Sequence, residues 1–353
     1  MDIYVLDENF NKIECVDHYQ SAIWNTKFFD AGDFELYLSA NAKNFNLFTI
    51  GRYLVRDTDI KDGCFYNVMI IEKIEIKSDI ESGNFMTVTG KDLKGLTARR
   101  IIDYQTNFNC TVEKAFRQLM NEHIIAPEVE ERKIDNVVLG EEKGFTEMIE
   151  QQVTGDNLME YLVSTLTSFN IGWTAHVNKN KKIEFNLVKG TDRSVQQSTN
   201  DRVVFSLAND NLISSDYTID YTSYKNTAMV LGEGEGKARK GATVGTATGL
   251  DRFELYVDKR DVSSNDGELT DSEYTAALEQ SGVEALAEYK KAENFENEIE
   301  KNVMFKLGQD YYLGDIVTVE TDYGLVTNPR IIGIIDSVSS EGESTVPTFS
   351  TYE

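Results

Sequence analysis

The sequence has few of the residues that mark secreted or metal-binding proteins. Its 353 residues include three cysteines, three histidines and three prolines. Cys15, Cys64 and Cys110 are odd in number, lie far apart and form no CxxC pair, which indicates reduced thiols and assembly in a cytosol. The histidines are too widely spaced for a local zinc-binding pair, so we predict no metal site.

Long apolar runs and an excess of basic residues are also absent. No segment reaches the roughly 18 apolar residues of a membrane span, and the acidic start MDIYVLDENF does not have the pattern of a secretory signal. We therefore expect a soluble, unprocessed chain without stable membrane insertion. The formal net charge of -25 argues against specific nucleic-acid binding, but it suits a surface that DNA passes without adhering.

The first hundred residues have the pattern of β-structure. Phe34, Leu36 and Leu38 alternate with polar residues, Gly32 marks a turn, and Asp62-Gly63 is a strong hairpin signal. With 41% hydrophobic residues, the chain can fill the cores of two or three domains.

Helical spacing appears twice between residues 105 and 200. One helix follows Thr111 as a plausible N-cap, and another begins at Asp156 or Asn157. The second helix leads into a hairpin, so this segment is predicted to be a small α+β unit.

The remaining chain returns to strands around one further helical segment. That segment opens with a capping box at Thr270 and Glu273, and we expect Gly282 to interrupt it. The resulting order β, α+β, β, α, β differs from the regular alternation of a doubly wound nucleotide-binding fold.

Possible catalytic and cofactor motifs are incomplete. LGEGEGKARKG has Leu231 and Ala238 where a Walker loop needs a glycine and a hydroxyl, and DTDIKDG has Lys61 and Val68 at calcium-ligand positions. No GxSxG nucleophile motif is present. We predict no catalytic, cofactor-binding or metal-binding residues and no enzyme activity.

Five stretches of the chain are informative together, namely residues 24–39, 88–102, 157–194, 203–236 and 295–319. In this order they resemble the tail-tip or baseplate hub proteins of tailed bacteriophages. The likeness is to siphovirus tail-associated proteins that correspond to the structural amino-terminal region of tail-associated lysins. The motif residues within the five stretches are Trp24, Gly32, Phe34, Gly90, Gly314 and Asp315.

The resemblance implies a mainly β fold with α+β insertions, built as two tail-tube-like β-barrel domains and two peripheral domains. The first barrel is expected at 1–104, the α+β domain at 105–200, the second barrel at 201–236 and 295–353, and an inserted loop and helical domain at 237–294. Family members form homotrimers whose six barrels imitate one hexameric ring of the tail tube.

The resemblance also implies a function at the virion tail tip, after assembly in the host bacterial cytoplasm. The hub would close the distal end of the tail tube and contact the distal tail protein ring, with an acidic channel for the tape-measure protein and DNA. Tip spike or receptor-binding proteins are further candidate partners. No lytic domain is expected.

Within YYLGDIVTV, residues 311–319, Gly314 is expected to permit a tight turn and Asp315 to cap backbone amides. Tyr312 or Leu313 is a candidate subunit contact, with ordinary core packing as the alternative.

Three other functions remain open from the sequence. A contractile bacteriocin or prophage-derived particle could use the same kind of hub. A host-carbohydrate-binding module would use exposed Trp24 and Trp173, although both are expected to be buried. A cell-wall hydrolase would need carboxylates that converge from distant positions.

Overall fold

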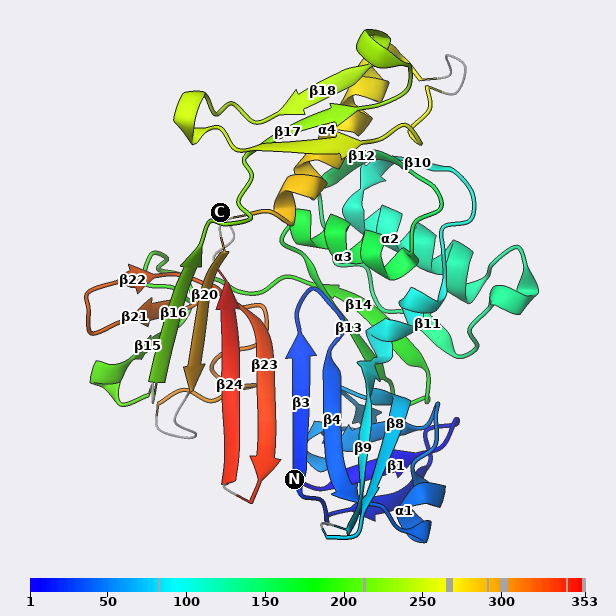
Figure 1. Ribbon diagram of the computed structural model, residues 1–353, viewed down its shortest axis with the longest axis vertical. Helices are drawn as coiled ribbons and strands as arrows, with labels where there is room; N and C mark the ends of the chain where they lie inside the picture. The colour runs from blue at the N-terminus through cyan, green and yellow to red at the C-terminus, as the bar shows by residue number, and fades with distance from the viewer. Residues whose placement is uncertain are drawn as a thin grey trace.

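The largest feature is one sheet that combines strands from both ends of the chain (Figure 1). The computed structural model describes residues 1–81, 83–211, 214–264, 269–290, 292–298, 304–340 and 342–350. The 11 strands follow the order β16 (Ser214–Asp220), β20 (Ala292–Glu298), β24 (Gly342–Ser350), β23 (Arg330–Ser339), β3 (Ser21–Lys27), β4 (Asp33–Ser39), β9 (Gly83–Asp92), β8 (Met69–Asp79), β5 (Tyr53–Arg56), β1 (Ile3–Leu6) and β2 (Lys12–Val16).

The predicted mainly β fold with several sheets is confirmed, but the two closed barrels are not. Within the described residues no sheet closes on itself, because strands of the two predicted barrels join side by side. β3 pairs antiparallel with β23, from Lys27 opposite Gly333 to Ser21 opposite Ser339. The division into four domains stays a prediction.

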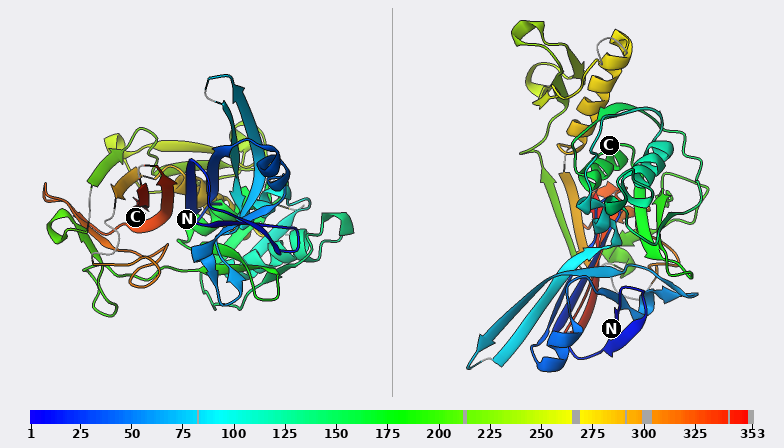
Figure 2. Two further views of the ribbon diagram at one scale, coloured as in Figure 1. Left: turned by 90° about the horizontal axis from the view of Figure 1, so that it is seen from below. Right: turned by 90° about the vertical axis from the view of Figure 1, so that its right-hand side faces the viewer.

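Along β3, β4 and β9 one face of the large sheet is buried and the other carries exposed residues, whereas β1 and β5 contribute buried residues to a core on each face. The alternation predicted for β4 is confirmed, with Phe34, Leu36 and Leu38 buried. These residues belong to a core behind β3, β4, β8 and β9, and a second core behind β23 and β24 includes Ile334 and Phe349. Figure 2 shows the sheet along one side of the molecule, with the β8–β9 hairpin extending beyond it.

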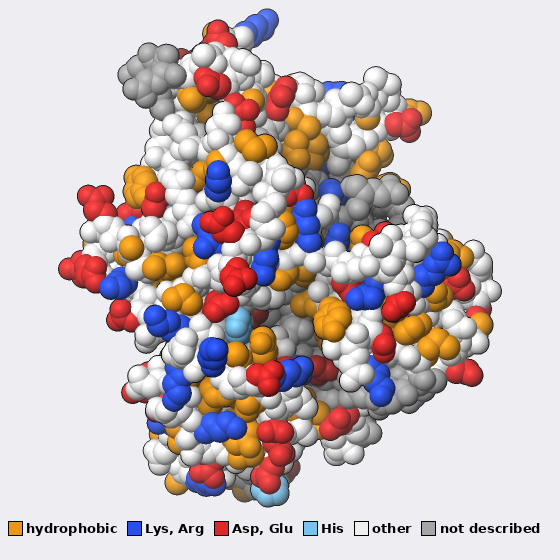
Figure 3. Space-filling view, turned by 180° about the vertical axis from the view of Figure 1, so that it is seen from behind, with side chains coloured by type: hydrophobic (Ala, Val, Ile, Leu, Met, Phe, Trp, Pro, Cys, Tyr) orange, Lys and Arg blue, Asp and Glu red, His pale blue; other side chains and the backbone are white. Residues whose placement is uncertain are grey.

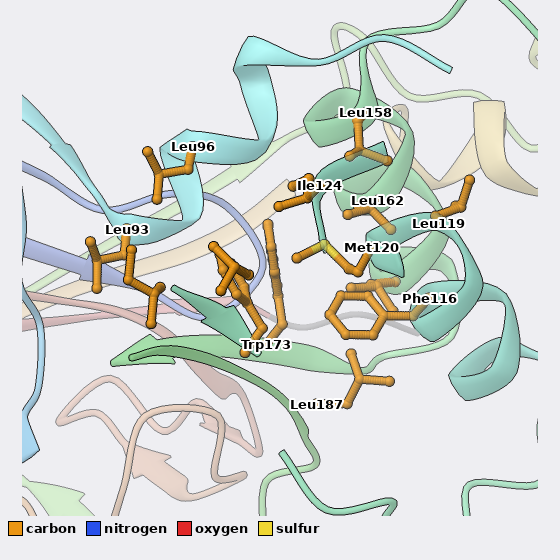
Figure 4. Packing of buried hydrophobic residues seen from close by; sticks show 14 of the residues in the cluster. Leu93, Leu96, Phe116, Leu119, Met120, Ile124, Leu158, Leu162, Trp173 and Leu187 are labelled. Atoms are coloured by element: carbon orange, nitrogen blue, oxygen red, sulfur yellow. The ribbon is translucent and has the colours of Figure 1, made fainter. Parts of the chain in front are cut away.

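The middle segment folds into helices and strands, and its sheet also includes β6 and β7 from the first segment, so the α+β domain at 105–200 stays a prediction. Thr111 and Asn157 are confirmed as N-caps of its two helices. Trp173 stacks on Phe185 at 6.0 Å and meets Phe116 edge-on at 6.2 Å in its core (Figure 4). The elements are α2 (Val112–Met120), α3 (Leu158–Ser168), β10 (Thr106–Thr111), β12 (Met148–Val153) and a five-stranded sheet of β11 (Val137–Leu139), β14 (Ile183–Val188), β13 (Gly172–Val177), β7 (Cys64–Phe65) and β6 (Ile60–Lys61).

Short elements complete these layers. The Asp62-Gly63 hairpin is confirmed between β6 and β7. The small β15–β21–β22 sheet packs beside β23 through their shared core. The bounds are β15 (Val204–Ser206), β21 (Thr318–Glu320), β22 (Val326–Thr327), α1 (Ala42–Leu47), a π-helix at Asn121–Ile125, and 3-10 turns η1 (Asp57–Asp59), η2 (Leu93–Arg99), η4 (Glu130–Arg132), η5 (Leu207–Asn209), η6 (Gly236–Ala238) and η7 (Gly249–Asp251).

The upper unit in Figure 1 consists of α4 on a three-stranded sheet. Its elements are α4 (Asp271–Ala287), β18 (Gly241–Val244), β17 (Thr227–Leu231) and β19 (Glu254–Asp258). The predicted capping box at Thr270 and Glu273 is confirmed. The expected interruption at Gly282 is wrong, because the helix continues through it. A Cβ there would lie 2.7 Å from Val244 Cγ2, so glycine instead lets the helix approach the sheet.

A buried carboxyl group lies where α4 packs on α3 and β12. The Glu284 carboxylate accepts hydrogen bonds from Gln151 Nε2 at 2.6 Å, Gln280 Nε2 at 3.2 Å and Thr165 Oγ1 at 3.4 Å. Burial raises the pKa of Glu284 to about 7, although these hydrogen bonds and the positive charge of Lys259 oppose the shift. The contact that holds the upper unit therefore includes a group that titrates near neutrality.

We predict that Glu284→Gln reduces the pH dependence of stability. Folded protein retains the Glu284 proton between about pH 4.5 and 7 while unfolded protein has lost it, so this group lowers the free energy of unfolding as the pH rises through that window. Relative to the variant, wild-type protein should lose on the order of 3 kcal/mol by pH 8. Chemical denaturation at several pH values measures this loss.

The control is Glu279→Gln, which makes the same charge change at an exposed position of the same helix. It should leave the pH dependence of wild-type protein unchanged. Parallel stability curves for wild type and Glu284→Gln would contradict the prediction.

Candidate functional site

Three motif residues of the first segment form a cross-strand row in the large sheet. Trp24 lies opposite Phe34, with ring centroids 5.6 Å apart, and Phe34 lies opposite Gly90. A Cβ at Gly90 would lie 1.8 Å from the carbonyl oxygen of Ile70, beside an irregularity in β8. Gly90 therefore permits the close pairing of β8 and β9 beside Phe34.

The turn between β3 and β4, residues 28–32, is fixed by buried charged groups. The Gly32 N–H donates to an Asp92 carboxylate oxygen at 2.9 Å. Lys94 Nζ donates to the carbonyl oxygens of Lys27 and Asp30 at 2.6 and 2.5 Å. Burial lowers the pKa of Lys94. The negative charge of Asp92, whose Oδ2 lies 3.7 Å from Lys94 Nζ, opposes this decrease. The charges serve to hold the backbone of this turn.

The Phe28 side chain extends from this turn into a space left by two glycines. A Cβ at Gly172 would lie 2.3 Å from the ring, and one at Gly314 would lie 2.2 Å from it. Trp173 Nε1 also donates to the carbonyl oxygen of Phe29 at 2.5 Å. The turn thus contacts both the middle segment and the tight turn predicted within residues 311–319, which we call the corner.

The corner contains Gly314 at φ +96°, a conformation that favours glycine. The buried Asp315 carboxylate accepts from the N–H groups of Thr191 and Tyr312 at 2.7 and 3.0 Å and from Arg193 Nε at 2.8 Å. Asp315 therefore connects the corner to residues 191–193, which are far away in the sequence.

Two further contacts close this region. A Cβ at Gly190 would lie 1.6 Å from the Gly314 carbonyl oxygen, to which Arg330 Nη1 donates at 2.5 Å. The Arg330 guanidinium lies 5.7 Å from the centre of the Phe28 ring. We refer to the set as the junction. It consists of Phe28, Gly172, Gly190, Gly314, Asp315 and Arg330.

The structure places the two candidate subunit contacts differently. Tyr312 is 47% exposed, whereas Leu313 is half-buried against the core that contains Phe205 and Tyr311. A subunit contact at Tyr312 or Leu313 stays a prediction.

Both tryptophans are buried, as expected. Trp24 is 1% exposed and Trp173 is 0% exposed. Neither ring can serve as a platform for a sugar, which removes the feature that motivated the carbohydrate-binding hypothesis.

Sequence reasoning did not identify the contacts of several junction residues. Phe28, Gly172, Gly190 and Arg330 lie in separate segments, and Lys94 occurs within an ordinary mixed stretch. Their roles depend on contacts between distant segments, so no local spacing could identify them.

A cleft of about 650 Å³ opens between α3, the end of α4 and the large sheet. Its lining contains both charge signs, including Asp30, Lys91, Glu160 and Glu288.

Among the described residues, no group of three His, Cys, Asp or Glu side chains could hold a metal ion. No helix in the described part of the chain is long and apolar enough to cross a membrane.

We predict that Gly314→Ala destabilises the fold more than Gly324→Ala. Both glycines have positive φ, but a Cβ at Gly324 has no atom within 4 Å, whereas one at Gly314 would overlap Phe28. Backbone strain is common to both variants, and overpacking adds about 1–3 kcal/mol at Gly314. Chemical denaturation of both variants measures the difference. Equal losses would contradict a structural role for the junction.

Several solved structures are similar to this chain. The tail protein of Neisseria meningitidis MC58 is 14% identical with a TM-score of 0.58, covering 99% of this chain and 96% of that chain. The prophage MuSo2 43 kDa tail protein of Shewanella oneidensis is 13% identical with a TM-score of 0.61, covering 99% and 98%. Prophage tail protein gp18 of Listeria monocytogenes EGD-e is 11% identical with a TM-score of 0.55, covering 100% and 95%.

At these identities the structural likeness shows the fold alone. Comparison with curated proteins gives no significant match. A family model matches residues 2–349, which is nearly the whole chain. The chain therefore belongs to the Siphovirus ReqiPepy6 Gp37-like protein family, whose members are structural phage tail proteins and not enzymes.

Proposed function

We propose that the protein is a trimeric hub that closes the distal end of a phage tail tube. It contacts the distal tail protein ring on one side and the tail tip on the other. The observation that carries this proposal is the continuous sheet, in which β16, β20, β24 and β23 lie beside β3, β4, β9 and β8. Each group of four strands comes from one predicted tube-like domain, so three chains supply six such groups.

The exposed face of these strands suits the wall of a channel. Its register brings hydroxyl groups into cross-strand rows, as at Ser337 opposite Ser344 and Ser21 opposite Ser339. These rows offer short polar side chains to a passing polymer, beside charged groups of both signs and the stacked rings of Tyr37 and Phe85 on the same face. We propose that the tape-measure protein, and then DNA, passes along this face.

The predicted channel is acidic, but the exposed face of the sheet carries both charge signs. Lysines and carboxylates are mixed on it, and Lys27 pairs with Asp33 at 2.7 Å. Figure 3 shows both charge signs interspersed on the opposite side of the molecule as well. Support for acidity therefore comes from the net charge of -25, which would repel DNA from the assembly as a whole.

The proposed position is the virion tail tip, and tip spike or receptor-binding proteins are further proposed partners. A contractile bacteriocin or prophage-derived particle is the second candidate setting. It is favoured by the prophage tail proteins among the similar structures. Both settings use the same hub.

We predict that the purified chain forms a trimer with a mass three times 39.9 kDa. Multi-angle light scattering over a range of protein concentrations and ionic strengths measures this mass. The trimer should persist as the salt concentration rises, because the extended sheet edges contribute backbone hydrogen bonds that salt screens little. A monomer at every concentration, or a closed dimer, would contradict the proposal.

A further inference from the structure

Two uncovered strand edges flank the sheet that we assign to the channel wall. Among the described residues, β16 pairs with β20 alone. At the other side, β5 pairs only with Met69 and Ile70 of β8, so residues 73–79 pair with β9 alone. Exposed edges carry unpaired N–H and C=O groups and readily pair with another chain.

We propose that these two edges bind each other between neighbouring copies, with β8 of one copy antiparallel to β16 of the next and Glu75 opposite Thr218. This inference rests on the proposed ring-shaped hub and names its subunit contact. The eight strands from β16 to β8 are antiparallel at every step, so β16 and β8 run in opposite directions. When neighbouring copies are related by rotation about an axis roughly parallel to the strands, the β8 edge of one copy and the β16 edge of the next therefore run antiparallel.

The side chains favour this register. It sets Lys73 opposite Asp220, a pair with opposite charges. Sliding one strand by two residues so that Glu75 lies opposite Asp220 would instead bring two negative charges together. A slip of one residue would exchange the two faces of the strand.

The other face of the proposed contact is apolar. The same register sets Ile74 opposite Ile219 and Ile76 opposite Tyr217. In the single chain Ile219 is 49% exposed and Ile76 is 42% exposed. Pairing would remove apolar surface from water at both positions.

The register also gives a strand tilt that a closed barrel can adopt. The cross-strand row through Glu75 passes Thr87, Tyr37, Ser21 and Ser339 and reaches Gly342 on β24. The row through Thr218 meets β24 at Ser350, eight residues further along.

The stagger of eight residues is measured along the strands at about 3.3 Å per residue, and the eight strands lie about 4.8 Å apart. The ratio of the stagger to the width of the eight strands corresponds to a tilt of roughly 35°. Closed barrels have tilts of about 35–45°. The tilt depends only on the ratio of the stagger to the number of strands, so it is the same for any number of copies in the ring. It therefore supports the register independently of the trimeric state.

Disulfide trapping tests the register directly. In a Cys15→Ser background, which removes an exposed thiol, Glu75→Cys and Thr218→Cys are combined and the native protein is treated with oxidised glutathione. Denaturing electrophoresis should show covalently joined chains up to the trimer. The control combines Glu35→Cys with Thr218→Cys, because Glu35 is exposed on the same face but lies on an interior strand. It should give no joined chains.

Charge reversal provides an independent test. Lys73→Glu and Asp220→Lys should each weaken assembly by roughly tenfold, and the double variant should restore it. Lys91→Glu is the matched control, since Lys91 is exposed on an interior strand and its reversal should leave assembly unchanged.

The outcomes separate this inference from the proposed function. A trimer that gives no Glu75–Thr218 cross-link and tolerates Lys73→Glu would overturn the register and leave the trimeric hub intact. Cross-linked chains in an assembly of another size would support the edge contact and overturn the trimer. Monomers without cross-links would overturn both.

Discussion

The Phe28 ring packs against Gly172 and Gly314, and this contact joins the turn after β3 to the middle segment and to the carboxy-terminal segment. β3 ends one residue before Phe28, and β23 begins at Arg330, whose guanidinium lies near the same ring. Any side chain at either glycine would occupy the space of the ring. The junction therefore fixes where the amino-terminal strands meet the carboxy-terminal strands, and the pairing of β3 with β23 follows from it.

That pairing decides which surfaces the protein can offer to partners. Because side chains alternate along each strand, one register between β3 and β23 aligns the polar faces of both groups of strands and keeps both cores on the other side. The result is one extended polar face, which in the described part of the chain is flanked by the edge of β16 and by residues 73–79 of β8. Such a surface suits assembly around a channel, and the chain belongs to a family of structural tail proteins.

Local features could be predicted from the sequence, whereas contacts between distant segments could not. The caps at Thr111 and Thr270 and the Asp62-Gly63 turn depend on neighbouring residues, and all three are confirmed. The Gly282 prediction was wrong because packing against β17 and β18 outweighs the weak helix propensity of glycine. Gly314 and Asp315 were predicted at a turn from their residue types, but their contacts with Phe28 and Arg193 had no local signal.

In the proposed hub, the polar face of the sheet encloses a channel. Electron microscopy of the purified assembly, with averaged views along its rotation axis, tests this claim most directly. A hub of this kind should appear as a three-fold ring around an open centre, with the β-sheets forming the inner wall and the α4 units at one end. A solid particle, or a ring in which the helical units line the centre, would contradict it.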